Sequence, residues 1–440
     1  MSTVDSNILL NYKASIHTKR RRSITVQATW FGVQTAVYTN AAAIANTKAI
    51  NAACLLVGSI GGGVVELPVG TILLASSNRA PVNWDDQYAI HIRNNGVSLK
   101  GQGIGKTILK LANNSNCHVI KIGSIEANLR VAYCSVEDLE IDANRVNQIM
   151  PSKLRDHFSG ITVSGWCRNT TLAGLYVHDT PYYGVGLGKE GLHECLVYDV
   201  ETNNTGADGL DWKNNSDDQI GGIVDSFTAR NFGLLPLSNV LTPQAGIDLR
   251  SGVQASNITI YQMTGESGLI GIRLQDGTSG SNAVQPSSVA NFRIMGSHAN
   301  NSVGLRVIPR SASAKNGFAN GCGDGFSFTN RDCTLSKLKA VSNGVGFRLW
   351  SASSQDSASG CTVDGITAID NNQAGVVCDS VSDDIFEDCD IHRNKIGYDI
   401  RSGSTNIQIA GGSCTDNTTQ LANNGAGTEI RLVHGLNSLL

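Results

Sequence analysis

The sequence predicts an all-β chain wound into a parallel β-helix, a solenoid in which each coil stacks on the previous one. Three observations point to this fold class. A short pattern recurs, in which a glycine is followed by an apolar, a variable and a second apolar residue. Its copies are 21 to 25 residues apart where they follow one another directly. The 440 residues also include 48 glycines against 8 prolines, which favours many short strands joined by tight turns.

The recurring pattern is clearest at Gly209-Leu210-Asp211-Trp212. Other copies begin at Gly160, Gly184, Gly246, Gly271, Gly304, Gly325, Gly346, Gly375 and Gly397. A polar turn with asparagine precedes most copies, as Asn343 precedes Gly346. Asparagine tolerates left-handed backbone, and equivalent asparagines on successive coils can bond to one another as an amide ladder. One coil is therefore a strand, an asparagine turn, a glycine-led strand and a loop.

The chain is expected to contain three regions. Residues 1–28 read as a polar N-terminal arm, residues 29–80 as a capping helix with the first strands, and residues 81–440 as the parallel β-helix. Where successive copies of the pattern are 29 to 37 residues apart, the extra residues predict loops that project from the solenoid. These loops are 232–244, 276–288 and 351–359.

The capping helix is predicted over residues 40–57. This segment is rich in alanine and has a broad apolar face, and Thr39 or Asn40 can serve as its N-cap. A helix directly before stacked strands suits the end of a solenoid, because it covers the first coil and its unpaired edge.

Composition and motifs exclude several classes of protein. The net charge of −3 provides no general attraction to nucleic acid or to an anionic membrane. The 11 cysteines lack the spacing of a zinc site or a disulfide framework, so they are interpreted as buried thiols, and no metal or cofactor is predicted. Gly103–Thr107 resembles the end of a phosphate-binding loop, but Lys100 stands where that motif requires glycine. Without an apolar signal segment or an 18-residue apolar run, we expect synthesis in a cytoplasm and no membrane insertion.

Several N-terminal segments, together with the repeats, resemble a known family over most of the chain. The resemblance is carried by His17–Val26 leading to Phe31-Gly32-Val33, by Thr39–Ile44 and by Gly61–Leu74, together with the repeats. In these segments the chain is similar to the pectate-lyase-like family of right-handed parallel β-helices and, within it, to bacteriophage tailspikes. The resemblance implies a homotrimer attached to a virion tail through the N-terminal arm. It also implies a bacterial surface polysaccharide, capsule or O-antigen, as substrate.

The variable residue of each glycine-led copy is expected to point outward, because side chains alternate along a strand. Rung by rung these residues are Thr162, Gly186, Asp211, Asp248, Arg273, Arg306, Ser327, Arg348, Val377 and Asp399. Adjacent rungs lie about 4.8 Å apart, so equivalent residues stack directly. Aspartates and arginines should therefore share one outward face.

This face supplies the candidate site residues. The predicted catalytic residues are Asp208, Asp211 and Asp248. Neighbouring carboxylates raise one another's pKa, and this provides the acid and the base that glycosidic hydrolysis needs. The predicted substrate-binding residues are Arg250, Arg273 and Arg306 for an acidic sugar, and Trp212, Tyr182 and Tyr183 for stacking on sugar rings.

The same residues allow three other interpretations of this face and of the function. The same charges could form a structural ladder in which Asp248 pairs with Arg273 and Asp211 is solvated, and such pairs contribute only about 0 to 1 kcal/mol. A polysaccharide lyase could use a basic side chain to remove the proton beside a uronate carboxylate. A noncatalytic adhesin would bind glycan without cleaving it.

Overall fold

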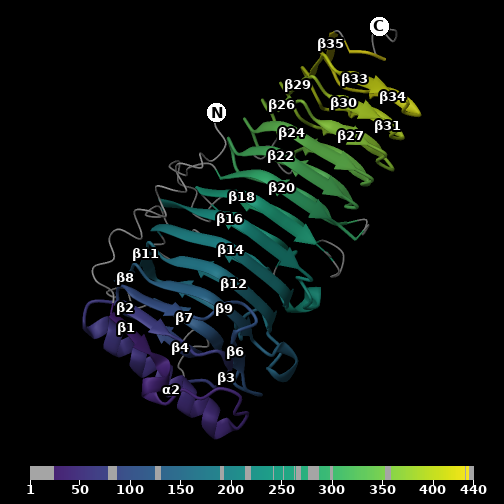
Figure 1. The fold of residues 1–440 in the computed structure, drawn as a ribbon. Coiled ribbons are helices and arrows are strands. Elements are labelled where there is room, and N and C mark those ends of the chain that lie inside the picture. Colours follow the sequence, from purple (N-terminus) through teal and green to yellow (C-terminus); the bar gives the residue numbers. More distant parts are fainter. Residues whose placement is uncertain are drawn as a thin grey trace. The chain divides into compact units, whose positions relative to one another are not determined.

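The computed structural model describes residues 24–77, 87–123, 130–188, 193–213, 220–240, 242–250, 252–261, 263, 269–275, 287–297, 301–351, 358–431 and 433–435. These residues form short strands that pair in parallel, with one long helix, which confirms the predicted fold class of a parallel β-helix with an N-terminal capping helix (Figure 1). The chain divides into two compact units. The first comprises residues 1–242 with 277–283, and the second comprises 243–276 with 284–440.

The described part of the first unit begins with a strand. β1 (Ile24–Gln27) pairs in parallel with β2 (Gly63–Glu66), which in turn pairs with β5 (Val97–Lys100). A single 3-10 turn, η1 (Ala28–Phe31), follows β1. The last residues of the expected N-terminal arm are therefore part of the first coil. The rest of that arm, residues 1–23, lies outside the described residues.

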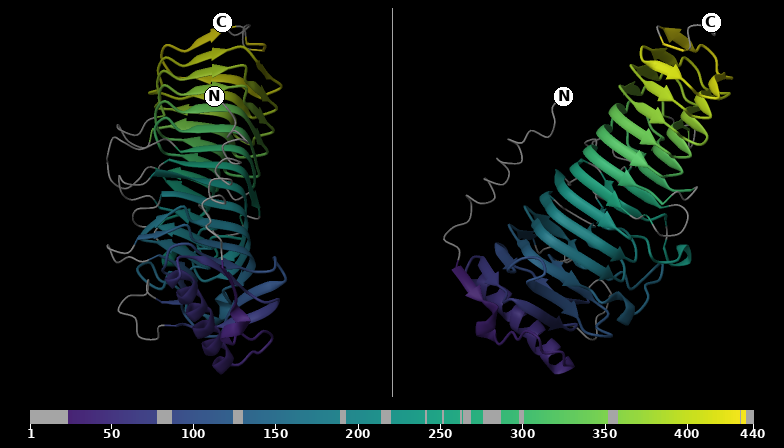
Figure 2. Two further views of the ribbon diagram at one scale, coloured as in Figure 1. Left: turned by 60° about the vertical axis from the view of Figure 1, so that its left-hand side comes forward. Right: turned by 45° about the vertical axis from the view of Figure 1, so that its right-hand side comes forward.

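The capping helix is α2 (Asn40–Ser59), close to the predicted range. Thr39 is its N-cap, because its Oγ1 accepts a hydrogen bond from the amide of Ala42 at 3.1 Å. Small and apolar side chains such as Ile50 and Val57 are buried against the first strands, and α2 lies across the end of the coils of this unit (Figure 2). By length and mean hydropathy α2 could span a membrane, but half of that window is buried in the protein.

Two parallel sheets build the first unit. One contains β3 (Gly70–Leu74), β6 (Thr107–Leu111), β8 (Arg130–Ala132), β9 (Ser135–Asp142), β11 (Trp166–Arg168), β12 (Thr171–Thr180), β14 (His193–Thr205) and β16 (Ile220–Arg230) in addition to β1, β2 and β5. The other contains β4 (Tyr88–Ile92), β7 (His118–Ile122), β10 (Ile161–Ser164), β13 (Val185–Gly188) and β15 (Leu210–Trp212). Gly103–Lys106 lies in the connection between β5 and β6, so the segment that resembles a phosphate-binding loop is a turn between strands.

The second unit repeats this arrangement. One sheet contains β18 (Val253–Tyr261), β20 (Ser288–Met295), β22 (Ser313–Asn320), β24 (Thr334–Val341), β26 (Thr362–Asp364), β27 (Thr367–Ile369), β29 (Ile385–Glu387), β30 (Asp390–His392), β32 (Gln408–Ala410), β33 (Ser413–Thr415) and β35 (Glu429–Arg431). The other contains β17 (Ala245–Arg250), β19 (Ile270–Gln275), β21 (Val303–Val307), β23 (Asp324–Phe328), β25 (Val345–Trp350), β28 (Ala374–Asp379), β31 (Ile396–Ile400) and β34 (Thr419–Asn423).

Apolar residues of the repeat fill the interior of each unit, as the pattern predicts. Phe326 and Phe347 occupy equivalent positions on β23 and β25, and their rings stack with centroids 4.8 Å apart. All eleven cysteines are buried and none forms a disulfide, which confirms their interpretation as core thiols.

The predicted asparagine ladder is present in the second unit. The amide side chains of Asn343, Asn371, Asn394 and Asn417 bond to one another on successive coils. The side-chain oxygens of Asn371, Asn394 and Asn417 also accept the backbone amide of the asparagine on the coil before them. That of Asn343 accepts the amide of Cys322. Side chains thus satisfy buried backbone donors at a turn, where no strand partner is available.

The described residues include only part of the three predicted projecting loops. Residues 232–240 contain a short 3-10 turn, η4 (Leu237–Asn239), and the Asn239 amide donates to the carbonyl of Pro151 at 2.8 Å. Residues 276–286 and 352–357, which make up most of the other two loops, lie outside the described residues.

Candidate functional site

The outward positions of the first unit stack in the predicted register. Thr162 pairs with Gly186, and Gly186 pairs with Asp211. The column also extends toward the N-terminus, where Lys121 pairs with Thr162 and His91 pairs with Lys121. The glycine-led pattern does not identify these two residues, because alanine replaces the leading glycine in β4 and valine replaces it in β7. The apolar, variable, apolar order is kept in both strands.

A hollow of about 130 Å³ lies over this column. It is lined by Thr162, Ser164, Gly186, Leu187 and Gly188, by His118, His157, Ser159 and Tyr183, and by Asp211 and Lys213. The hollow exists because the column changes from large to small side chains at Gly186. A Cβ atom added there would lie 3.5 Å from the ring of Tyr183 and 3.6 Å from the hydroxyl of Ser159. The missing side chain therefore leaves space beside Asp211.

Asp211 is the carboxylate that lines this hollow. It is buried, and its Oδ2 forms an ion pair with Lys213 Nζ at 2.7 Å. Its Oδ1 is buried without a hydrogen-bond partner among the described residues. A buried carboxylate oxygen without a donor is costly, because its desolvation is not compensated, so its presence points to a function. Asp211 is therefore the strongest catalytic candidate of the first unit.

Tyr183 and Lys213 form the polar wall beside Asp211. Lys213 Nζ donates to the Tyr183 hydroxyl at 2.8 Å and lies 4.8 Å from the centre of its ring. Burial raises the pKa of Tyr183 well above its usual value, and the neighbouring Asp211 charge raises it further. At neutral pH Tyr183 thus keeps its proton, and it is hydrogen-bonded to Asp211.

Asp208 and Asp211 come together as predicted. A carboxylate oxygen of Asp208 lies within 4.8 Å of one of Asp211, and Asp208 is only 3% exposed. The chain bends at Gly209 between them, while the Asp208 carbonyl accepts the amide of Gly184 at 3.0 Å. Asp208 is not among the residues that line the hollow, so it is a buried neighbour of Asp211.

The stacking roles predicted for Trp212 and Tyr182 are wrong. Trp212 is 1% exposed, and its ring occupies the space that a side chain at Gly222 would need. It is the second apolar residue of its repeat, so it points into the coil. Tyr182 is 3% exposed and stacks on His157 with ring centres 3.9 Å apart. Of the three predicted aromatic residues, Tyr183 is the one that lines the hollow.

In the second unit, the charge-ladder alternative is confirmed for Asp248. Its Oδ2 accepts from Arg273 Nη2 at 2.6 Å, and both of its oxygens lie 2.7 Å from the side-chain amide of Gln275. Arg273 also donates to the carbonyl of Pro243 at 2.7 Å, and Arg250 lies 3.7 Å from Asp248. Arg273 and Arg250 are thus engaged in the scaffold. The catalytic role of Asp248 stays a prediction.

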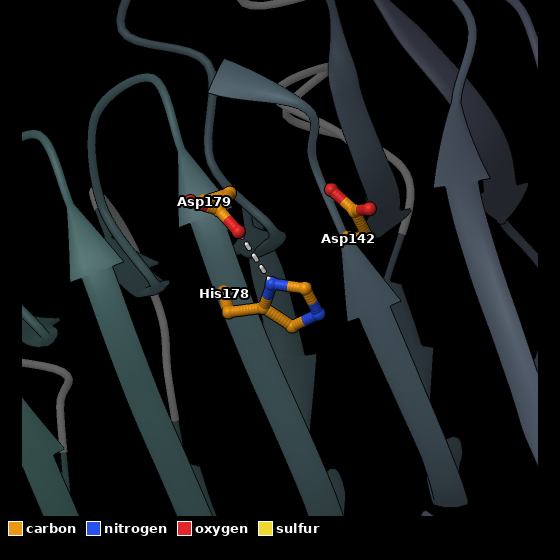
Figure 3. A group of neighbouring side chains, drawn as sticks. All are labelled: Asp142, His178 and Asp179. Carbon is orange, nitrogen blue, oxygen red and sulfur yellow. Dashed lines mark hydrogen bonds and ion pairs between the residues drawn. The ribbon is translucent and has the colours of Figure 1, made fainter. Parts of the chain in front are cut away.

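A second polar cluster lies on the other sheet of the first unit and joins Asp142 of β9 to His178 and Asp179 of β12 (Figure 3). His178 Nδ1 is 2.7 Å from Asp179, and its Nε2 is 3.2 Å from Glu140. Burial favours the neutral ring. The hydrogen bond to Asp179, the charge of Asp142 and the hydrogen bond to Glu140 outweigh burial, and they raise the pKa of His178.

This cluster has the atom types of a metal site, but its groups are already paired. The potential ligand atoms of Asp142, His178 and Asp179 lie within 4.8 Å of one another. Yet Asp142 forms an ion pair with Lys110 and accepts the amide of Asn144, and both ring nitrogens of His178 face carboxylates. A protonated histidine and a lysine thus supply the positive charge that a metal ion would bring. We interpret the cluster as a charge network.

Comparison with known proteins adds the following. No protein-family model matches the chain. Over 183 residues it is 27% identical to the mannuronan C5-epimerase AlgE6 of Azotobacter vinelandii, and this match spans 41% of the chain but only 20% of the relative.

Solved structures show that the fold is shared more widely. The N-terminal fragment of bacteriophage phi29 gene product 12 aligns with a TM-score of 0.57 at 14% identity, over 92% of this chain and 70% of that one. The AlgE6 A-module aligns with a TM-score of 0.52 at 15% identity, over 92% and 98% of the two chains. The catalytic unit of an α-1,3-glucanase from Streptomyces thermodiastaticus aligns with a TM-score of 0.52 at 12% identity, over 94% and 68%. These likenesses confirm the parallel β-helix fold.

Proposed function

We propose that this chain is a tailspike-type depolymerase that binds a bacterial surface polysaccharide, capsule or O-antigen, and cleaves it internally by hydrolysis. The observation that carries the proposal is the buried Asp208–Asp211 pair, with Asp211 facing a hollow. The fold is shared with a bacteriophage gene product, with an epimerase of the polysaccharide mannuronan and with an α-1,3-glucanase. This range of relatives supports a glycan as the substrate and a phage as the source.

The two carboxylates suit a double-displacement hydrolysis. Asp211 Oδ1 has no donor and can attack the anomeric carbon of a sugar in the hollow. Asp208 does not line the hollow, so its proton would reach the departing oxygen through one water molecule. Water then releases the sugar from Asp211. Carboxyl groups about 5 to 5.5 Å apart favour retention of configuration, and those about 6.5 to 9.5 Å apart favour inversion. An oxygen separation within 4.8 Å supports retention.

The test is substitution by asparagine in the full chain. Wild type is incubated with a panel of capsules and O-antigens, and products are followed by reducing-end release and mass analysis. On the substrate so identified, Asp211→Asn and Asp208→Asn should each lower the rate by about 10² to 10⁴-fold. Asp248→Asn is assayed beside them, and Asp332→Asn, at a turn of the second unit, is the matched control. Full activity in Asp211→Asn and Asp208→Asn would refute the assignment.

A second candidate function is lyase chemistry, favoured by the contact between Lys213 and Tyr183. Lys213 can neutralise a uronate carboxylate, and His157, which lines the same hollow, can accept the adjacent proton. A lyase product absorbs in the ultraviolet because it contains an unsaturated uronate. Cleavage of a uronate polymer without this absorbance would exclude the lyase, whereas its appearance would replace hydrolysis as the mechanism.

We also propose that the protein is a homotrimer that is attached to a virion tail by its N-terminal arm. Large apolar side chains are exposed near the capping helix, among them Trp30 at 71%, Tyr38 at 65% and Val69 at 61%. Such a group is typical of a subunit contact. Light scattering should give three times the chain mass of 46.5 kDa. A wild-type protein that stays monomeric at micromolar concentration would contradict the proposal.

A further inference from the structure

Arginine and aspartate form ion pairs along the outward face of the second unit. The pairs are Asp248 with Arg273 at 2.6 Å, Asp324 with Arg348 at 2.8 Å, and Asp379 with Arg401 at 2.9 Å. Arg306 belongs to the same column, in register with Arg273 on one side and Ser327 on the other. Among the described residues it has no hydrogen bond or ion pair, and its Nε is buried without a partner. One guanidinium of this face thus lacks a bonded partner and is stabilised only at longer range by the charge of Asp324.

Arg306 lines a hollow of about 280 Å³. Arg306 Cζ lies 5.9 Å from the ring centre of Trp350, and Trp350 Nε1 donates to Ser327 Oγ at 3.0 Å, which fixes the indole. Val303 adds a second apolar surface. The volume is close to the lower end of the range of about 300 to 1,000 Å³ for ligand pockets, so one sugar residue is a suitable occupant.

The electrostatic environment indicates the charge of that occupant. Burial lowers the pKa of Arg306, the neighbouring Arg273 guanidinium lowers it further, and the charge of Asp324 offsets these two effects only in part. The group stays charged at neutral pH. The carboxylates that line the same hollow, Asp324 and Asp379, are bonded to other arginines. A partly buried cation without a partner destabilises the protein, and an incoming anion offsets that cost.

We propose that this hollow is a subsite for an acidic sugar, with the sugar carboxylate on Arg306 and the ring of the sugar against Trp350. The inference rests on the proposed function, since it takes a polysaccharide as the ligand. It goes beyond that function by specifying a uronate-containing polymer, and by assigning the recognition of the charge to Arg306 and not to Arg273 or Arg250, which are engaged with Asp248.

Affinity electrophoresis tests the proposal. All variants carry Asp211→Asn, so that cleavage does not shorten the polymer during the run. Separate gels contain polygalacturonate, alginate or hyaluronate as uronate polymers, dextran as a neutral polymer, and polyphosphate as an anion without sugar rings. Arg306→Met removes the charge and Arg306→Lys retains it. Arg293→Met is the matched control, because Arg293 also lies over an aromatic ring, at 5.1 Å from Phe318, but on the other sheet.

We expect at least one uronate polymer to retard the protein, with the apparent dissociation constant about tenfold higher in Arg306→Met and little changed in Arg306→Lys and Arg293→Met. Dextran should not retard any variant. The proposal is overturned if no uronate polymer binds, if Arg306→Met binds as well as Arg293→Met, or if polyphosphate binds as tightly as the best uronate polymer. Because binding is measured without cleavage, an inactive wild type would refute the hydrolase while leaving this result intact.

Discussion

The outward columns of the two units follow the same repeat but have different contents. In the first unit the column ends in two small positions and a carboxylate, Thr162, Gly186 and Asp211, and a hollow lies over them. In the second unit several of the equivalent positions hold large charged residues, and Asp248 and Arg273 pair from one rung to the next. A solenoid can thus open a hollow by omitting side chains from a column, and it can stiffen a column by filling it with charge pairs.

The polar side-chain networks of the two units also differ. In the second unit a buried asparagine ladder links four successive coils. In the first unit the outward face of the sheet that holds β9 and β12 carries the histidine and carboxylate network around His178. Amide ladders are neutral and fully bonded, so they stabilise at any pH. The charged network makes stability depend on protonation, because its bonds change when a proton is lost.

Filling the hollow of the first unit should have the largest effect. Gly186→Phe places a ring beside Asp211, where an added Cβ meets nothing closer than 3.5 Å, so the fold should tolerate it. We expect depolymerase activity to fall to the detection limit while the melting temperature stays within a few degrees of wild type. Reducing-end release and thermal unfolding measure the two quantities.

Gly186→Ala is the matched control for this variant, because a methyl group leaves most of the hollow open. If Gly186→Phe were as active as Gly186→Ala, the hollow would not be the place where the substrate reacts, and the contrast between the two columns would lose its functional meaning.

Breaking the asparagine ladder should have the next largest effect, and this effect should be on the free energy of unfolding alone. Asn371→Ala removes the oxygen that accepts Asn343 N at 3.0 Å and the amide that donates to Asn394 at 2.8 Å. The buried backbone donor of Asn343 then has no partner, and the expected loss is about 2 to 4 kcal/mol in denaturant unfolding. Asn372→Ala, at the exposed neighbouring position, should cost under about 0.5 kcal/mol. Equal losses in the two variants would show that the ladder is not a source of stability.

The repeat made the fold and the ladder predictable, because a glycine, two apolar residues and an asparagine recur at nearly constant spacing. It also placed Asp211 and Arg306 on the outward column. The same periodicity explains why Trp212 is buried, since it occupies an inward position of its copy. Sequence alone could not show that Asp248 is bonded to Gln275 as well as to Arg273, because hydrogen bonding depends on rotamers.

The residues that sequence missed have identifiable causes. Lys213 stands two positions after Asp211, on the same side of the strand. Arg250 stands in the same relation to Asp248. Lys121 lies on a copy without the leading glycine. His157 comes from the irregular segment between β9 and β10, where no periodicity applies, and only the folded chain brings it to the hollow.

The charged network of the first unit should show a smaller, pH-dependent effect. The pKa of His178 is raised in the folded state. Its contribution is therefore fully present below the unfolded value, about 6.5, and is lost as the pH rises through the folded pKa. We expect His178→Gln to destabilise by about 1 kcal/mol at pH 5.5 and by clearly less at pH 9. His392→Gln is the control in the second unit, because that ring contacts the hydroxyl of Thr415. A loss that is the same at both pH values would contradict the assignment.

The smallest effect should come from the charge pairs at the C-terminal end of the second unit's column. Asp399 Oδ2 lies 3.0 Å from Arg401 Nε, and the same guanidinium also binds Asp379 at 2.9 Å. Arg401 is 42% exposed, so solvent screens the pair, and Asp399→Asn leaves Arg401 its second carboxylate. We expect a change of about 0 to 1 kcal/mol in unfolding free energy, smaller still at high salt, and no change in activity. A loss above about 2 kcal/mol, measured by denaturant unfolding, would show that these pairs hold the coils together. The charge pairs of the second unit's column would then be an important source of its stability.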